Sequence, residues 1–224
     1  RGKWISFIDG DDAVSNTFFE SLASVFSSDY DVVRFKHTSF TDKIPNIEKE
    51  KGDLLPLDED LVQKIGISAA VRYRVYDDKK LLDLNISESL VTTAVYRRAF
   101  LLQNGCRFDE DLKAAEDSLF NAFVCAKRPR YGVFAETLYY YRSNPYSVTK
   151  KFNENIKSVT DAYLAKIRRF LDKTYPNDKN IIRNFYRYRC GLALISNFEL
   201  NLFNPNNKKP IKQRKNEFLK LIAE

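Results

Sequence analysis

The stretch KWISFIDGDDAVSNTFFESL, residues 3–22, decides the fold. Its apolar beginning, residues 3–8, predicts a short buried strand that runs directly into Asp9-Gly10-Asp11-Asp12. Ser15 or Asn16 is placed to cap a following helix over residues 17–26. Residues 32–35, VVRF, read as the next strand. This strand–helix–strand order predicts an α/β domain.

The rest of the chain is divided by turn residues and by apolar periodicity. Residues 41–60 are polar and contain Pro45, Gly52 and Pro56, which favours a loop. Asn104-Gly105 supplies a left-handed residue where a helix ends. The other expected elements are a helix over 61–71, a charged turn over 77–83, a strand over 90–95, a helix over 96–103, a helix over 116–126, strands over 131–134 and 138–141, and helices over 155–174, 178–202 and 211–222.

Composition indicates a soluble, globular protein of 224 residues with 44% hydrophobic and 30% charged residues. The sequence contains no apolar run of 18 residues, so we expect no transmembrane helix. Cys106, Cys125 and Cys190 lie far apart, which argues against a zinc site or a disulfide framework and favours reduced thiols in the cytoplasm. The single histidine, His37, is expected to be structural or exposed, and Trp4 to lie in the core.

The net charge of +7 is distributed unevenly. Residues 150–224 hold 17 Lys and Arg against 7 Asp and Glu, whereas residues 1–149 hold 20 against 23. A basic tail of this kind suits an anionic lipid surface or an anionic polymer, although a solvated helical face explains it equally well. The Tyr- and Arg-rich stretch 183–189 fits helix packing better than nucleic-acid binding.

Two interpretations of the acidic cluster are open from its residues alone. Three carboxylates at the end of a strand repel one another unless a cation lies among them, and oxygen ligands suit Mg²⁺ or Mn²⁺. Ligands of open α/β sheets bind beyond the carboxyl ends of the strands, where Asp9, Asp11 and Asp12 are expected. The alternative is an Asp/Gly turn in which Asp12 or Ser15 caps the next helix.

Residues 3–22 resemble the central segment of family-2 glycosyltransferases of the GT-A fold, in which an apolar strand precedes D-x-D-D and an aromatic-rich helix. The resemblance implies a mixed sheet flanked by helices, with Asp9 and Asp11 meeting the ribose and the metal-bound diphosphate of a nucleotide sugar and Asp12 in support. Mn²⁺ or Mg²⁺ would be held by Asp11 and Asp9.

A second acidic pair, Glu116-Asp117, lies in FDEDLKAAEDSLFNAFV, residues 108–124. Acids in the first turn of a helix are favoured by its dipole by about 0.3–1 kcal/mol, which is a sufficient structural explanation. The segment also resembles the family's G-E-D helix start, which implies that Asp117 is the general base for the acceptor hydroxyl and that Glu116 orients the acceptor or the base. Ala115 stands where the family usually has Gly.

A third segment, LYYYRS at residues 138–143 with SVT at 147–149, resembles the family's Y-x-Y-R and S-[IV]-[TS] ending. A planar guanidinium suits diphosphate because it donates paired hydrogen bonds. The resemblance makes Arg142 and Ser147 candidates for binding the diphosphate or the acceptor. The alternative is an ordinary strand with an exposed arginine.

The resemblance covers residues 3–149. Relatives carry strand–helix units for the nucleotide base ahead of the D-x-D strand, so we expect this core to be N-terminally incomplete, with residues missing upstream. We therefore expect a partial GT-A-like catalytic core over residues 1–150 and a basic helical region over 151–224.

The expected function is transfer of a sugar, with inversion, from a nucleoside-diphosphate donor to a carbohydrate, lipid-linked or protein-linked acceptor in glycan or cell-surface polysaccharide synthesis. We expect a cytoplasmic location, with membrane contact at the inner face through the tail. One alternative is a non-catalytic module that binds an anionic polymer or membrane through that tail. Another is a metal-dependent nucleotidyl or phosphoryl transferase.

Overall fold

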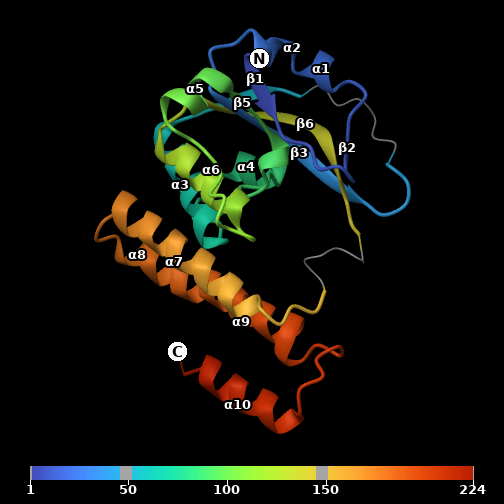
Figure 1. Cartoon of the computed structure of the whole chain (residues 1–224). Coiled ribbons are helices and arrows are strands. Elements are labelled where there is room, and N and C mark those ends of the chain that lie inside the picture. The colour runs from blue at the N-terminus through green and yellow to red at the C-terminus, as the bar shows by residue number, and fades with distance from the viewer. Residues whose placement is uncertain (1, 46–51, 145–150, 224) are drawn as a thin grey trace. The chain divides into compact units, whose positions relative to one another are not determined.

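The computed structural model describes residues 2–45, 52–144 and 151–223. The chain forms two compact units, Arg1–Glu110 with Glu116–Ser143, and Asp111–Ala115 with Asn144–Glu224. The first unit contains a sheet and its covering helices, and the second is helical (Figure 1). The mixed α/β class predicted from the sequence is confirmed.

Within the described residues, six strands form one mixed sheet in the order β1-β5-β3-β6-β2, with β4 paired to β6. Strands β3 and β6 are parallel, and β5 is antiparallel to both β1 and β3. The carboxyl ends of β1, β3 and β6 therefore lie at the same edge of the sheet. The strands are β1 (Trp4–Ser6), β2 (Ala13–Val14), β3 (Val32–Phe40), β4 (Leu54–Leu57), β5 (Ala94–Arg97) and β6 (Tyr131–Arg142).

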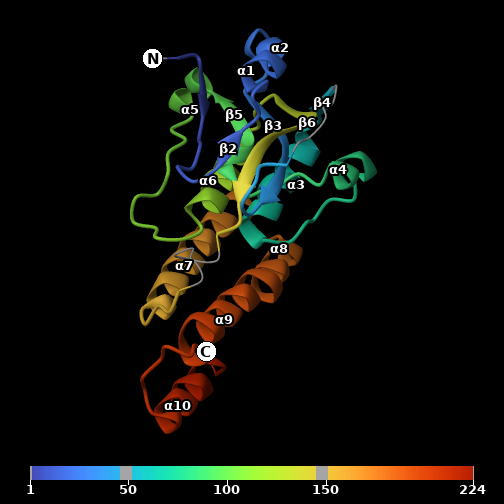
Figure 2. The same cartoon turned by 90° about the vertical axis from the view of Figure 1, so that its right-hand side faces the viewer.

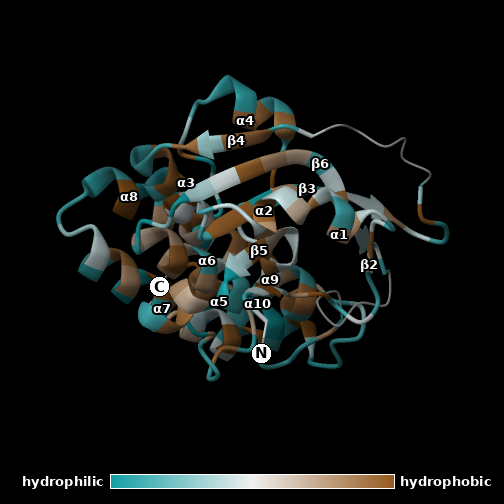
Figure 3. Cartoon of the chain, turned by 90° about the horizontal axis from the view of Figure 1, so that it is seen from above, coloured by the Kyte–Doolittle hydropathy of each residue, from teal (hydrophilic) through white to brown (hydrophobic). Residues whose placement is uncertain are grey.

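Helices cover both faces of this sheet (Figures 1 and 2). Side chains that include Val33, Phe35 and Leu138 form one core with α1 and α2, while those that include Val32, Tyr96 and Val133 form another with α3 and α6. Figure 3 shows the apolar stretches of β4 and β6 in brown. The helices of this unit are α1 (Phe18–Ser21), α2 (Ala23–Phe26), α3 (Glu59–Val71), α4 (Lys79–Leu84), a 3-10 turn (Val91–Thr93), α5 (Arg98–Gln103) and α6 (Glu116–Ala126).

Several elements differ from the sequence prediction. The helix expected over 17–26 is two short helices that meet at Leu22. The loop expected over 41–60 contains β4, a four-residue strand whose proline is tolerated because the strand lies at an edge. The charged turn expected over 77–83 contains α4, because the Asp78 carboxylate caps Leu81 N at 3.0 Å and Leu81 is buried. The strand expected over 90–95 begins later, at Ala94, after the 3-10 turn.

The two strands expected over 131–134 and 138–141 are a single strand, β6, with a bulge. Its pairing with β3 is regular up to Phe35↔Phe134 and then shifts, so that His37 lies opposite Tyr139. Glu136 lies in the bulge, and its carboxylate accepts a hydrogen bond from Ser21 Oγ at 2.9 Å. The bulge lets one strand pair first with β4 and then, farther along, with β2.

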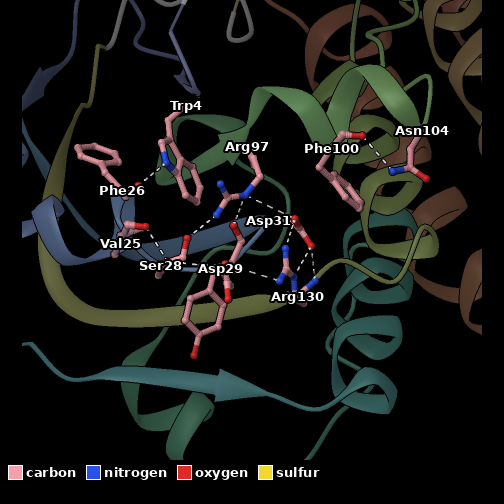
Figure 4. A network of polar contacts seen from close by, with 11 residues as sticks. Trp4, Val25, Phe26, Ser28, Asp29, Asp31, Arg97, Phe100, Asn104 and Arg130 are labelled. Atoms are coloured by element: carbon pink, nitrogen blue, oxygen red, sulfur yellow. Dashed lines mark hydrogen bonds and ion pairs between the residues drawn. The ribbon is translucent and has the colours of Figure 1, made fainter.

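A cluster of polar contacts lies at the opposite edge of the sheet, where β3 and β6 begin (Figure 4). The Arg97 guanidinium lies 4.7 Å from the Trp4 ring centroid and donates to the carbonyls of Tyr30, at 2.8 Å, and Ser28. The Asp31 carboxylate lies 3.6 Å from Arg97 and 3.3 Å from Arg130. Trp4 is thus half-buried against this cluster rather than fully in the core.

The second unit consists of long helical segments. Helix α7 is Ile156–Thr174, and a continuous helical run follows from α8 (Lys179–Asn184) through π-helical turns (Phe185–Cys190 and Phe198–Leu202) that flank α9 (Gly191–Asn197). Helix α10 is Ile211–Leu221. Buried Asn197 ties α9 to α7 by donating to Thr160 Oγ1 at 3.0 Å. In the part of the chain described, no helix has both the length and the apolar character needed to cross a membrane.

Candidate active site

The topology brings the first and third sequence motifs together. Asp9-Gly10-Asp11-Asp12 follows β1, and Tyr139 to Arg142 form the end of β6 at the same edge of the sheet. Strand β2 comes directly after the acidic turn and pairs with β6, with Ala13 opposite Tyr140. The turn is therefore held against the end of β6 by backbone pairing.

Asp12 holds the acidic turn in place. Its Oδ2 accepts a hydrogen bond from the Tyr139 hydroxyl at 2.5 Å, and its Oδ1 accepts one from Arg142 N at 2.7 Å. The Asp12 backbone N–H donates to Asp9 O at 3.1 Å, which closes the turn. Burial, and then the hydrogen bond to Asp12, raise the pKa of Tyr139, so that its hydroxyl remains a donor. Both oxygens of Asp12 are thus engaged within the protein.

Asp9 and Asp11 have exposed carboxylates that accept no hydrogen bond from any residue that the structure describes. Partial burial raises the pKa of Asp9, and the negative charges of Asp12, Asp11 and Glu116 raise it further. Among the described residues, no group of three or more acidic, His or Cys side chains is arranged to hold a metal. Two free carboxylates nevertheless fit Mg²⁺ or Mn²⁺, which take one or two protein carboxylates together with phosphate oxygens.

The second acidic pair, Glu116-Asp117, begins α6 as predicted. The charge of Glu116 contributes to the raised pKa of Asp9 in the acidic turn. The pKa of Asp117 is raised to about 6, first by burial and also by the charges of Glu116 and Asp9, against the lowering effects of the Val91 N–H and Arg34. Val91 N lies 3.4 Å from Asp117 Oδ2. Asp117 is thus a half-buried carboxyl whose pKa lies close to the range required of a general base at neutral pH.

Ala115, directly before this pair, has a left-handed backbone with φ of 65°. An L-residue with a Cβ is disfavoured there by roughly 1–2 kcal/mol, whereas glycine is not. The glycine that the resembled family places at this position therefore has a conformational reason, and this chain adopts the same backbone with alanine.

Sequence reasoning missed Arg34, which is fully buried beneath the Asp117 side of the site. Its guanidinium donates to Tyr131 OH at 2.7 Å, to Leu90 O at 2.7 Å and to Asn121 Oδ1 at 3.1 Å. It also donates to Ser87 O and Thr93 Oγ1. Arg34 thereby fixes the segment 87–93, which supplies the Val91 N–H to Asp117. The available signal was an arginine inside an otherwise apolar strand, VVRF.

Asn121 links the same network to α6, one turn after Asp117. Its Oδ1 accepts from Tyr96 OH at 2.7 Å as well as from Arg34, and its Nδ2 donates to Ser89 O at 3.0 Å. Every polar atom of this buried amide side chain is therefore engaged. The network connects β3, β5, β6, α6 and the segment 87–93 at one point.

Arg142 is bound to the acidic turn rather than extended into solvent. Its Nε donates to Asp11 O at 2.7 Å and its Nη1 to Thr41 O at 3.1 Å, and its guanidinium lies 4.5 Å from the Phe40 ring centroid. Tyr141, beside it, has its pKa raised by burial and then by Asp12, Asp11 and Asp9. Ser147, the other candidate of this motif, lies outside the described residues.

The chain has the fold of the glycosyltransferase TarS of Staphylococcus aureus: its crystal structure, residues 1–349 with UDP-GlcNAc, superimposes with a TM-score of 0.58 at 16% identity, over 99% of this chain and 56% of that one. The complex of the same fragment with UDP gives a TM-score of 0.52 at 17% identity, over 96% of this chain and 53% of that one.

Two curated proteins are similar in sequence. The uncharacterized glycosyltransferase EpsJ of Bacillus subtilis (strain 168) is 26% identical over 98% of this chain and 60% of its own length. The poly(ribitol-phosphate) beta-N-acetylglucosaminyltransferase TarS of Staphylococcus aureus (strain Mu50 / ATCC 700699) is 25% identical over 70% of this chain and 23% of its own length. The chain thus spans three-fifths or less of these relatives. No family model matches it.

Proposed function

We propose that this chain contributes the catalytic centre of a glycosyltransferase that uses a nucleoside-diphosphate sugar. The observation that carries the proposal is the combination of Asp9 and Asp11, whose carboxylates accept no hydrogen bond from the described residues, with the half-buried Asp117, whose pKa is about 6 and is raised in part by the charge of Asp9. The similarity to TarS, whose fragment was crystallised with UDP-GlcNAc, supports the donor class and makes UDP-GlcNAc the first donor to test.

In this proposal each acid has its own role. Asp117 removes the proton from an acceptor hydroxyl, an effect worth about 10²–10⁴-fold in rate. Glu116 orients the acceptor or the base, and Arg142 holds the acidic turn next to the diphosphate. Attack from the face opposite the departing diphosphate gives inversion. Mg²⁺ or Mn²⁺ held by Asp9 and Asp11 would neutralise charge on the diphosphate.

The organisation follows the same proposal. Residues 1–150 form a partial GT-A-like core of the family-2 type, and the basic helical region 151–224 meets the acceptor or an anionic surface at the cytoplasmic side. The whole enzyme's acceptor is a carbohydrate or a carrier-linked glycan.

The test separates donor binding from chemistry. UDP and UDP-GlcNAc are titrated into the chain with Mn²⁺, and into Asp11→Ala and Asp117→Asn. We expect Asp11→Ala to lose metal-dependent binding and Asp117→Asn to retain it. Transfer to acceptor is then measured in a protein extended upstream, where Asp117→Asn should reduce the rate by at least about 100-fold. Undiminished transfer by Asp117→Asn would refute the assignment of the base.

A further inference from the structure

A polar cavity of about 380 Å³ lies in the first unit, apart from the residues of the acidic turn and of the Glu116-Asp117 pair. Its walls come from the end of α3, from the segment after α4 and from β3, and they include His37, Arg72, Arg74, Glu88 and Ser89. Sites for small molecules occupy roughly 300–1,000 Å³, so this cavity has room for a small organic ligand.

The charges of the cavity wall do not cancel. Arg74 Nε lies 2.6 Å from Glu88 Oε1, and Tyr76 OH donates to the same oxygen, so Arg74 and Glu88 offset each other's charge. Arg72 donates from Nη1 to Ser89 Oγ at 2.6 Å and is paired with no carboxylate in the described part of the chain. The wall therefore carries an excess of positive charge.

A second positive charge lies behind the wall. Arg34 donates to Ser87 O, and within the described residues the five acceptors that its guanidinium contacts are neutral oxygens. Its charge also lowers the pKa of Asp117, which accepts a hydrogen bond from the Val91 N–H of the segment 87–93. The positive charge of Arg34 adds to that of the wall and favours an anion in the cavity.

His37 also lines the cavity. Its Nδ1 is buried and has no hydrogen-bond partner among the described residues. Burial, and then the charge of Arg34, lower the pKa of His37, so the ring is neutral at pH 7 and has one N–H to donate. Because Nδ1 is closed off from the cavity, the ring nitrogen that an oxyanion can reach is Nε2, whose N–H would donate to it together with Arg72.

We propose that this cavity binds the phosphate group of a small organic phosphate, with Arg72 and His37 as its main ligands. The cavity is larger than a phosphate alone needs, and the hydroxyls and amide of Ser87, Ser89 and Asn85 in its wall suit the hydroxyls of a polyol or sugar. Planar guanidinium groups favour phosphate because they donate paired hydrogen bonds. No residue proposed for the nucleotide site takes part, so this site stands independently of the proposed function.

The experiment is a calorimetric titration of the chain with glycerol 3-phosphate, inorganic phosphate and glycerol, in a buffer without phosphate. The variant is Arg72→Gln. The control is Arg128→Gln, because Arg128 is an exposed arginine of the same unit with almost the same left-handed backbone, φ of 53° against 56°, and does not line the cavity.

We expect one saturable site for glycerol 3-phosphate, none for glycerol, and binding about tenfold weaker in Arg72→Gln with no change in Arg128→Gln. Tighter binding of glycerol 3-phosphate than of inorganic phosphate assigns the site to an organic phosphate, and the reverse order would overturn that assignment. Absence of saturable binding, equal weakening in both variants, or displacement by saturating UDP would overturn the site itself.

Discussion

Burial of the Asp117 carboxyl has opposite effects on the proposed activity and on the stability of the fold. A general base at neutral pH needs a pKa near its working range, and burial supplies this by disfavouring the charged carboxylate. The same burial makes the ionised form a cost to the fold. Function and stability are therefore linked at this one side chain, and both consequences are measurable.

The activity should follow the ionisation of Asp117. Because only the carboxylate accepts a proton, we expect the transfer rate to rise with pH through about 6 and then to level off. The measurement is the pH dependence of kcat with saturating donor. A rate that is flat between pH 5 and 8 would contradict the assignment.

The ionisation of Asp117 should also make the stability of the fold depend on pH, but in the opposite direction to the activity. The folded carboxyl binds its proton more tightly than the unfolded one, whose pKa is near 3.8, so stability is lost as pH rises from about 4 through about 6. Asp117→Asn mimics the protonated acid, and we expect it to raise the unfolding free energy at pH 8 by up to about 3 kcal/mol, with little effect at pH 4. Equal effects at both pH values would mean that the ionisation is not responsible.

Ala115 offers a second test at the scale of one residue. Ala115→Gly relieves a left-handed alanine at the cost of greater freedom in the unfolded chain, so we expect a net stabilisation of about 0.5–1 kcal/mol in urea unfolding. Ala122→Gly, in the buried middle of α6, is the matched control and should destabilise by about 1 kcal/mol. Destabilisation by both changes would exclude strain at Ala115.

At the scale of elements, the buried amide of Asn121 holds α6 against the sheet and against segment 87–93. Asn121→Leu leaves Arg34, Tyr96 OH and Ser89 O each short of a partner, so we expect a loss of about 3 kcal/mol. Unfolding is followed by the fluorescence of Trp4, the single tryptophan, which lies in this unit. Asn216→Leu on exposed α10 should have no effect on this signal; an equal effect would contradict the role of the network.

Elements with a strong local signal were predictable from the sequence. Helix α6 has the predicted bounds, Glu116–Ala126, because its apolar positions repeat regularly, and Gly105 has the expected left-handed backbone after α5. The bulge in β6 was not predictable, because Ala135-Glu136-Thr137 resembles a turn when its partners in β3 are unknown. Strand β4 and helix α4 were missed because long-range pairing and a capping aspartate outweigh a polar composition.

The candidate site was predictable as a set of residues but not as an arrangement. Asp9, Asp11 and Asp117 could be singled out from their sequence context, and the parallel strands place Asp12 beside Tyr139 and Arg142. Which of the acids is held by hydrogen bonds and which is exposed depends on contacts between residues more than 120 positions apart, such as Asp12 with Tyr139. The Arg34 network joins residues of β3, β5, β6 and α6, so no local sequence pattern could reveal it.

At the scale of the whole molecule, positive charge is concentrated in the second unit. Helix α10 exposes Lys212, Lys215 and Lys220 together with apolar Ile211 and Leu219. Exposed apolar and basic side chains on one helix suit the interface of an anionic membrane. The charge distribution therefore supports membrane contact through the tail, as a proposal separate from catalysis.

The prediction is binding to vesicles with anionic lipid that weakens with salt. Replacing Lys212, Lys215 and Lys220 by Gln should weaken it by roughly 100-fold, since each lysine contributes about 1 kcal/mol near such a surface. The control replaces the exposed Lys43, Lys79 and Lys80 of the first unit by Gln, which changes the net charge equally. Sedimentation with vesicles measures both, and an equal loss in the two triple variants would contradict a role for α10.

The bulge of β6 also bears on how this protein tolerates changes in chain length. Its extra residues lie between Phe134, which pairs regularly with Phe35, and Tyr139, which anchors Asp12. Because side chains alternate between the two faces of a strand, deleting one of residues 135, 136 and 138, which have no partner in β3, would turn Tyr139 away from the acidic turn while the first half of the strand kept its pairing. Insertions and deletions in related sequences should therefore be excluded from these three positions and accumulate instead beyond Arg142.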